Sequence, residues 1–176
     1  MMRKFKRVDL TGATEDYFLK VGEEAYISFS NVTQVPLHIA TQDRTYYEMH
    51  IIPANAGGTS GASTDPTYLY PNNTTYADAF VFAYICRHQT LFNSESSTHS
   101  AFRVGSRFCS SISWITNRTT YKNIRFIVDV YGFSSGYPSL GIASSDWRDT
   151  TTPWTSLGTV VFPQSTSGEI LVRRLR

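Results

Sequence analysis

Residues 123–133, NIRFIVDVYGF, constrain the fold more than any other stretch, because apolar side chains recur at every second position. In an extended chain, the even-numbered residues from Ile124 to Val130 share one apolar face. The odd-numbered residues from Arg125 to Tyr131 share a mixed face. A period of two in β-branched and aromatic residues is typical of a half-buried β-strand. The stretch therefore predicts a central strand with one dry face.

Further runs of this kind follow one another along the chain. Tyr46–Ile52 alternates, and Tyr76–Cys86 is apolar on both faces, which indicates a covered strand that pairs with residues 123–133. Residues 92–100 have the character of a polar link. Leu157–Phe162 and Glu169–Leu175 predict a final hairpin.

About eight to ten such strands, with no helix of more than one turn, predict the fold class. We expect an all-β protein, an antiparallel β-sandwich that is jelly-roll-like, with long loops and little or no helix. Residues 1–24 are expected to form a basic, polar N-terminal arm, and residues 25–176 a single β-sandwich domain.

A long interruption, Pro53–Thr75, is rich in Gly, Pro and small polar residues. Loops of this length are uncommon and often functional. It is interpreted as an ordinary surface loop or as a contact loop between subunits, with Tyr68 and Tyr70 as contact residues.

Charge is concentrated at the two ends of a chain whose net charge is only +2. These ends are either solvated or form a basic contact with an acidic neighbouring subunit. We expect no nucleic-acid partner, because aromatic residues for base stacking do not interleave with the charges. The basic residues are Arg3, Lys4, Lys6 and Arg7 at the start, and Arg173, Arg174 and Arg176 at the end.

The first residues, MMRKFKRVDL, lack the apolar core of a secretory signal, and no run of 18 apolar residues occurs. A secreted or membrane-spanning protein is therefore not expected. Cys86 and Cys109 are predicted to be buried free thiols, with a disulfide left open if their strands are neighbours.

The residues that usually carry chemistry show no recognisable spacing. The four histidines are scattered, and the chain has neither a Gly-x-Ser-x-Gly elbow nor a phosphate-binding glycine loop. The sequence predicts no catalytic residues, no metal site and no cofactor. A non-enzymatic protein is expected.

A binding role has better support, from a threonine-rich stretch between two tryptophans. Trp147, with Arg148 beside it, and Trp154 could stack against sugar rings, anchor a protein interface, or cap the core. The candidate partner-binding residues are Arg3, Lys4, Lys6, Arg7, Tyr68, Tyr70, Trp147, Arg148 and Trp154.

The last quarter of the chain, TPWTSLGTVVFPQSTSGEILVRRLR (residues 152–176), is similar to C-termini of tail and capsid-surface proteins of tailed bacteriophages. The resemblance implies a virion protein that is assembled in the bacterial cytoplasm, forms a homo-oligomer, with a trimer favoured because trimers are frequent in such proteins, and needs no enzymatic cofactor. The doubled Met at the start favours a complete small gene product. We expect a capsid decoration or small tail protein that binds neighbouring virion subunits. The alternative is a receptor- or carbohydrate-binding module of a tail fibre or tailspike.

Overall fold

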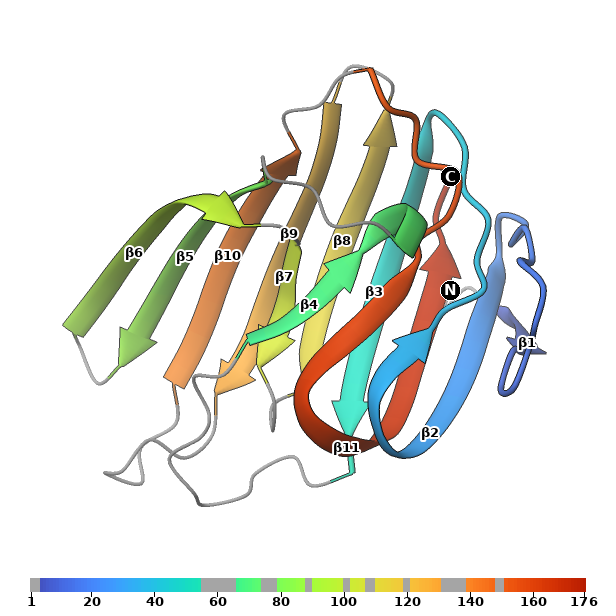
Figure 1. Cartoon of the computed structure of the whole chain (residues 1–176), viewed down its shortest axis with the longest axis horizontal. Helices are drawn as coiled ribbons and strands as arrows, with labels where there is room; N and C mark the ends of the chain where they lie inside the picture. The colour runs from blue at the N-terminus through green and yellow to red at the C-terminus, as the bar shows by residue number, and fades with distance from the viewer. Residues whose placement is uncertain are drawn as a thin grey trace.

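The computed structural model describes residues 4–54, 66–73, 79–87, 90–99, 102–106, 110–118, 121–130, 139–147 and 151–176. These residues form eleven β-strands and one short 3-10 turn, η1 (Figure 1). Their bounds are β1 Lys6–Asp9, β2 Glu23–Pro36, β3 Thr45–Pro53, β4 Pro66–Tyr70, η1 Pro71–Asn73, β5 Ala79–Arg87, β6 Thr90–His99, β7 Phe102–Ser106, β8 Ser111–Arg118, β9 Tyr121–Val130, β10 Ser139–Trp147 and β11 Thr159–Arg174.

All eleven strands belong to one hydrogen-bonded sheet. Its main path runs β1-β2-β11-β3-β8-β9-β10-β5-β6, and β4 joins β7 to β11 beside this path. Every pair is antiparallel except β1 with β2. The predicted all-β fold is confirmed. The finer prediction of a jelly-roll sandwich stays a prediction, because the strands form one connected sheet and not two separate ones.

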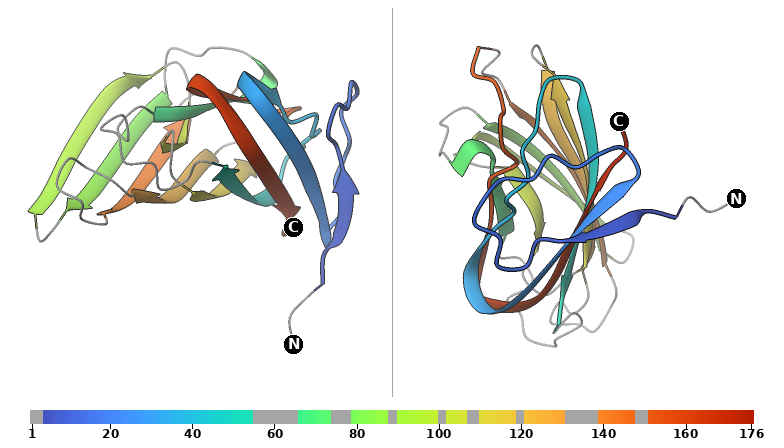
Figure 2. Two further views of the ribbon diagram at one scale, coloured as in Figure 1. Left: turned by 90° about the horizontal axis from the view of Figure 1, so that it is seen from below. Right: turned by 90° about the vertical axis from the view of Figure 1, so that its right-hand side faces the viewer.

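The sheet folds over itself where β2 and β11 bend together (Figures 1 and 2). Their pairing register shifts between Val161 and Thr166 and again before Gly168, and such bulges bend strands. On one side of the bend β11 pairs with β3, and on the other side with β4. We call the path from β1 to β6 the main sheet. The part beyond the bend, with β4 and β7, is the small layer.

The core lies between the main sheet and the small layer. On β3, the odd-numbered residues from Thr45 to Ile51 are buried, whereas the even-numbered residues between Tyr46 and Ile52 are partly or fully exposed. From the small layer, Leu69, Val104 and Val160 are fully buried against this face. The alternation predicted for Tyr46–Ile52 is therefore confirmed, and it fixes an inner and an outer face of the main sheet.

The central position predicted for residues 123–133 is confirmed for β9, which lies between β8 and β10. The predicted pairing with Tyr76–Cys86 is wrong, because β10 lies between β9 and β5. Residues 92–100, interpreted as a link, fall largely within β6. Their backbone pairs with β5 although their side chains are mostly polar.

Two further expectations change for the same reason, which is that pairing partners lie far away in the chain. The predicted hairpin of Leu157–Phe162 and Glu169–Leu175 is wrong, since both halves belong to β11 and pair with β2. The second half of the Pro53–Thr75 loop forms β4 and η1. Residues 55–65 lie outside the described part.

The N-terminal segment, assigned to an arm from sequence alone, is packed against the sheet as far as it is described. Residues 6–9 form the edge strand β1 beside β2 (Figure 2). Leu10 and Leu19 belong to the hydrophobic core. Tyr17 exchanges backbone hydrogen bonds with His38 and Ala40, at 2.8 and 3.0 Å. Residues 4–24 thus contribute to the domain that they precede.

Candidate interaction surface

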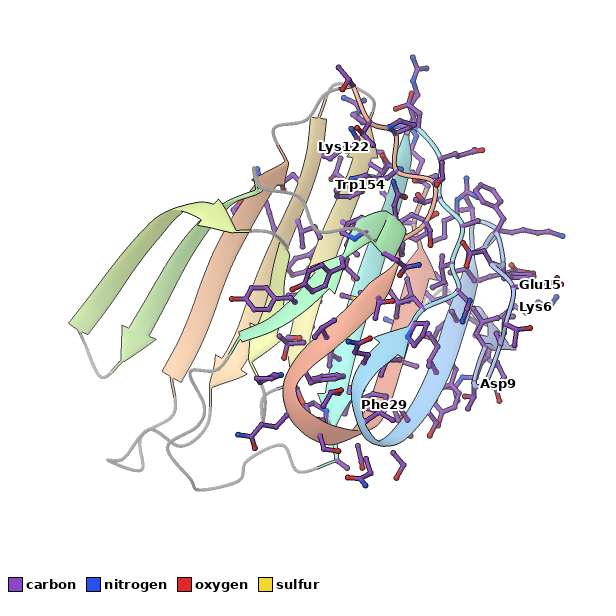
Figure 3. All side chains as sticks on the ribbon, in the orientation of Figure 1. Lys6, Asp9, Glu15, Phe29, Lys122 and Trp154 are labelled. Carbon is purple, nitrogen blue, oxygen red and sulfur yellow. The ribbon has the colours of Figure 1, made fainter. Side chains whose placement is uncertain are left out.

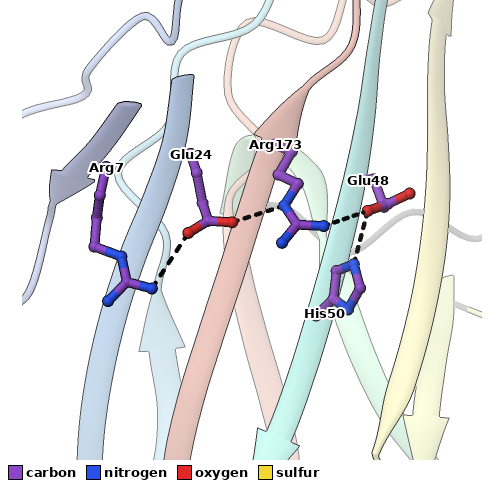
Figure 4. A network of polar contacts seen from close by, with 5 residues as sticks. All are labelled: Arg7, Glu24, Glu48, His50 and Arg173. Atoms are coloured by element: carbon purple, nitrogen blue, oxygen red, sulfur yellow. Dashed lines mark hydrogen bonds and ion pairs between the residues drawn. The ribbon is translucent and has the colours of Figure 1, made fainter. Parts of the chain in front are cut away.

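A line of charged side chains crosses four strands on the outer face of the main sheet (Figure 4). Arg7 on β1 lies opposite Glu24 on β2, Glu24 lies opposite Arg173 on β11, and Arg173 lies opposite Glu48 on β3. His50 follows two residues after Glu48, on the same face. Opposite charges that are direct cross-strand neighbours stabilise a sheet. We call these five residues the charged row.

Arg173 is the centre of the charged row. Its Nε donates to Glu24 Oε2 at 2.6 Å, and its Nη1 donates to Glu48 Oε1 at 3.0 Å. The same Glu48 oxygen lies 2.7 Å from His50 Nε2, and Arg7 Nη2 lies 3.4 Å from Glu24 Oε1. The Arg173 side chain is 29 % exposed and that of Glu24 only 9 %. These partly buried charges are therefore held by one another.

Glu48 and Arg173, at the centre of the charged row, both have shifted pKa values. Partial burial by itself would raise the pKa of Glu48, but hydrogen bonds from His50 and Arg173 outweigh it and hold this pKa below its ordinary value. Burial would likewise lower the pKa of Arg173, and the carboxylates of Glu24 and Glu48 raise it instead. Glu48 and Arg173 are thus both stabilised in their ionised forms.

Aromatic rings and the carboxylate of Glu23 also contact basic side chains at the two ends of the chain. The guanidinium groups of Arg7, Arg173 and Arg174 lie over the rings of Tyr26, Phe5 and Phe18, at 4.9, 5.2 and 4.4 Å. Lys6 Nζ lies 3.7 Å from the buried carboxylate of Glu23. A backbone hydrogen bond from Lys20 holds the pKa of Glu23 below its ordinary value, and Tyr17 and Lys6 add to this.

Apolar side chains lie next to the charged row on the same outer face of the main sheet. Trp114 on β8 lies opposite Glu48 and is 37 % exposed, and Ile52 on β3 is 38 % exposed. Arg125 on β9 lies opposite Trp114 and is exposed. A half-buried Ile112 lies opposite His50. We call Ile52, Ile112, Trp114 and Arg125, together with the charged row, the outer patch.

The sequence-predicted binding residues have separate positions. Lys4 is exposed, and Lys6 and Arg7 are on β1. Tyr68 and Tyr70 are half-buried neighbours on β4, with ring centroids 6.4 Å apart and edge-to-face. The backbone of Trp147 ends β10, opposite Lys122. Arg3, Arg148 and Cys109 lie outside the described residues, as do the side chains of Trp147 and Cys86.

The prediction that Trp154 binds a partner is wrong. This tryptophan was a candidate binding residue, but its side chain is 1 % exposed and belongs to the hydrophobic core (Figure 3). Asn117 Nδ2 donates to its carbonyl oxygen at 3.1 Å, which ties the irregular segment before β11 to β8. A sugar ring has no access to the Trp154 indole in this fold. The alternative function therefore loses one of its two predicted platforms.

The sequence reasoning missed Glu24, Glu48 and His50 as partners of the basic ends, and Trp114 as an exposed aromatic. A signal for part of this was present, because Glu48 and His50 share the polar face of Tyr46–Ile52. Nothing in the sequence indicated that β3 pairs with β11, and it is this pairing that brings Glu48 to Arg173, 125 positions away in the chain.

Comparisons with known proteins add no identification. No family model matches the chain, and neither a curated protein nor a solved structure matches it.

Among the described residues, no group of three or more His, Cys, Asp or Glu side chains could hold a metal ion. The part of the chain that the structure describes also contains no helix with the length and apolar character to cross a bilayer.

The charged row makes a prediction for pH dependence. Because the pKa of Glu48 is lowered on folding, the native state binds fewer protons than the unfolded state as the pH falls below about 4.5. The contribution is fully present above that pH and is lost as the pH falls through the folded-state pKa. Glu48→Gln should cost about 1 kcal/mol of unfolding free energy at pH 7 and less at pH 3. Urea unfolding at both pH values measures this.

The control for this comparison is Glu15→Gln, at an exposed position of the N-terminal segment (Figure 3). It should change the unfolding free energy by no more than about 0.5 kcal/mol at either pH. An equal cost of Glu48→Gln at pH 7 and pH 3 would show that the ionised row adds no stability.

Proposed function

We propose that this chain is a structural protein of a tailed-phage particle, non-enzymatic, which binds neighbouring capsid or tail subunits. In this proposal it forms a homo-oligomer, with a trimer favoured, and acts as a decoration or small tail protein. The placement in a virion has its support in the similarity of residues 152–176 to C-termini of phage tail and capsid-surface proteins.

The observation that carries the binding role is the outer patch. Trp114 and Ile52 are exposed large apolar side chains on a β-sheet face, where strand pairing holds them in place. Tryptophan and arginine are the residues enriched among the energetic centres of protein interfaces. The charged row beside them is paired internally, so a partner can cover it without stranding an isolated charge.

The test is to locate the chain in purified particles and to disturb the patch. Particles assembled with Trp114→Glu should contain at least about tenfold fewer copies by quantitative mass spectrometry, since about 1.4 kcal/mol corresponds to that factor. The matched control is Val21→Glu, at a 59 % exposed apolar residue in the turn before β2. It should leave the copy number unchanged.

Absence of the chain from particles would contradict the proposal, as would normal incorporation of the Trp114→Glu variant. Light scattering on the purified chain gives a separate check. A stable monomer that never co-sediments with particles would also count against the assembly role.

A further inference from the structure

A pocket lies on the outer side of the small layer, separate from the outer patch, which is on the main sheet. Its lining comes from three strands and η1: Gln34 on β2, Tyr70 on β4, Asn73 on η1, and Thr159 and Val161 on β11. Thr159 lies opposite Tyr70, and Val161 lies opposite both Gln34 and Tyr68. Its volume of about 360 Å³ lies within the range of small-molecule sites.

The walls of this pocket are held in place by hydrogen bonds. Thr159 Oγ1 donates to Asn73 Oδ1 at 2.6 Å. The neighbouring Asn72 donates from Nδ2 to the Pro153 carbonyl at 2.9 Å, and its Oδ1 accepts from the backbone N–H groups of Thr155 and Ser156. Both asparagines have a positive φ, which asparagine tolerates better than most residues. A pre-formed site loses little entropy when a ligand binds.

The chemistry of the lining selects a class of ligand. The described lining residues carry no charged side chain, so they offer no counter-charge to a phosphate or a metal ion. The lining instead offers amides, hydroxyls and an aromatic ring. With its oxygen engaged by Thr159, Asn73 still has the N–H donors of Nδ2, and Thr159 still has oxygen lone pairs. In the described structure the Gln34 amide has no hydrogen-bond partner.

Tyr70 supplies the apolar surface. Its half-buried ring packs edge-to-face against Tyr68, which fixes its orientation, while Leu69 between them points into the core. A pyranose ring has one aliphatic C–H face and a rim of neutral hydroxyls. An aromatic ring beside amide and hydroxyl groups matches both.

We propose that this pocket binds a neutral hexopyranose, stacked on Tyr70 and hydrogen-bonded by Gln34, Asn73 and Thr159. The site differs from the tryptophan loop that the sequence suggested, and it does not depend on the proposed assembly role. A chain with both properties would contact its particle through the outer patch and a sugar through the small layer.

The test uses the full isotope-labelled chain titrated with methyl glycosides of glucose, galactose and mannose and with N-acetylglucosamine, followed by amide chemical shifts. At least one should shift residues 70, 73 and 159 together. Tyr70→Ala should weaken that binding about tenfold or more, whereas Tyr70→Phe should retain most of it, because the ring face remains. Trp114→Ala, in the outer patch, should bind like the unmodified chain.

If Tyr70→Ala does not fold, Gln34→Ala serves instead, because Gln34 is exposed and its loss leaves the strand pairing intact. A weakening by at least threefold in folded Gln34→Ala supports the site. Several results would overturn the proposal. These are no binding of any of the four sugars, shifts confined to other residues, and unchanged affinity in folded Tyr70→Ala or Gln34→Ala.

Discussion

Trp154→Ala should lower the free energy of unfolding by about 4 kcal/mol, the typical cost of deleting a large buried aromatic side chain. The indole is 1 % exposed and is among the largest fully buried side chains in the described part of the fold. Its removal leaves a cavity in the hydrophobic core cluster, to which Leu157 and Ile115 also belong. Urea unfolding followed by circular dichroism measures the loss.

Trp114→Ala is the matched control, because it removes the same side chain from an exposed position. We expect it to change the unfolding free energy by less than about 1 kcal/mol. If the two variants lost equal stability, Trp154 would have no special place in the core. This pair also decides how sugar-binding data are interpreted, since a Trp154→Ala variant that fails to bind would have lost its fold first.

Gly158→Ala should cost about 3 kcal/mol or more, for two reasons that act together. Gly158 has φ +76°, and a Cβ at this position would overlap the backbone carbonyl of Tyr70 and crowd Asn73. The glycine is therefore needed where β11 begins and passes η1. Thermal and urea unfolding measure the loss of stability. The substitution should also distort the proposed sugar pocket, because Tyr70 and Asn73, which line it, must move to make room for the Cβ.

Gly12→Ala separates the two reasons. Gly12 has φ +71°, close to that of Gly158, but a Cβ there would meet nothing within 4 Å. We expect a cost of about 1 kcal/mol from the backbone conformation alone. The excess loss in Gly158→Ala then measures the steric part. Equal losses in the two variants would contradict a close approach at Tyr70.

The candidate surfaces show what local pattern could and could not predict. Alternation placed Glu48 and His50 on one face of a strand and Tyr47 and Met49 on the other, as the structure has them. It could not identify Arg173 as the partner of Glu48, because that contact joins strands far apart in the chain. The pocket was equally hidden, since its residues come from positions 34 to 161.

Trp114 and Trp154, the tryptophans whose side chains the structure describes, also show that alternation predicts side-chain position only within a strand. Trp114 lies in a strand, and its outward position follows once Ser113 and Ile115 are known to be buried. Trp154 lies in an irregular segment without a period, so nothing in its neighbours indicates burial. The structure buries it, and the earlier interpretation of a binding platform has to be given up.

By itself, the sequence determined the all-β class, the central place of the strand within residues 123–133 and the two faces of β3, because side-chain direction in a strand alternates with a period of two. Only the tertiary structure decided which strands are neighbours. That choice made β11 one bent strand and not a hairpin, placed β10 between β5 and β9, and joined the two basic ends through Glu24. The physical reason is that strand pairing is non-local: backbone hydrogen bonds are alike along every strand, and the partner is selected by how the whole core packs.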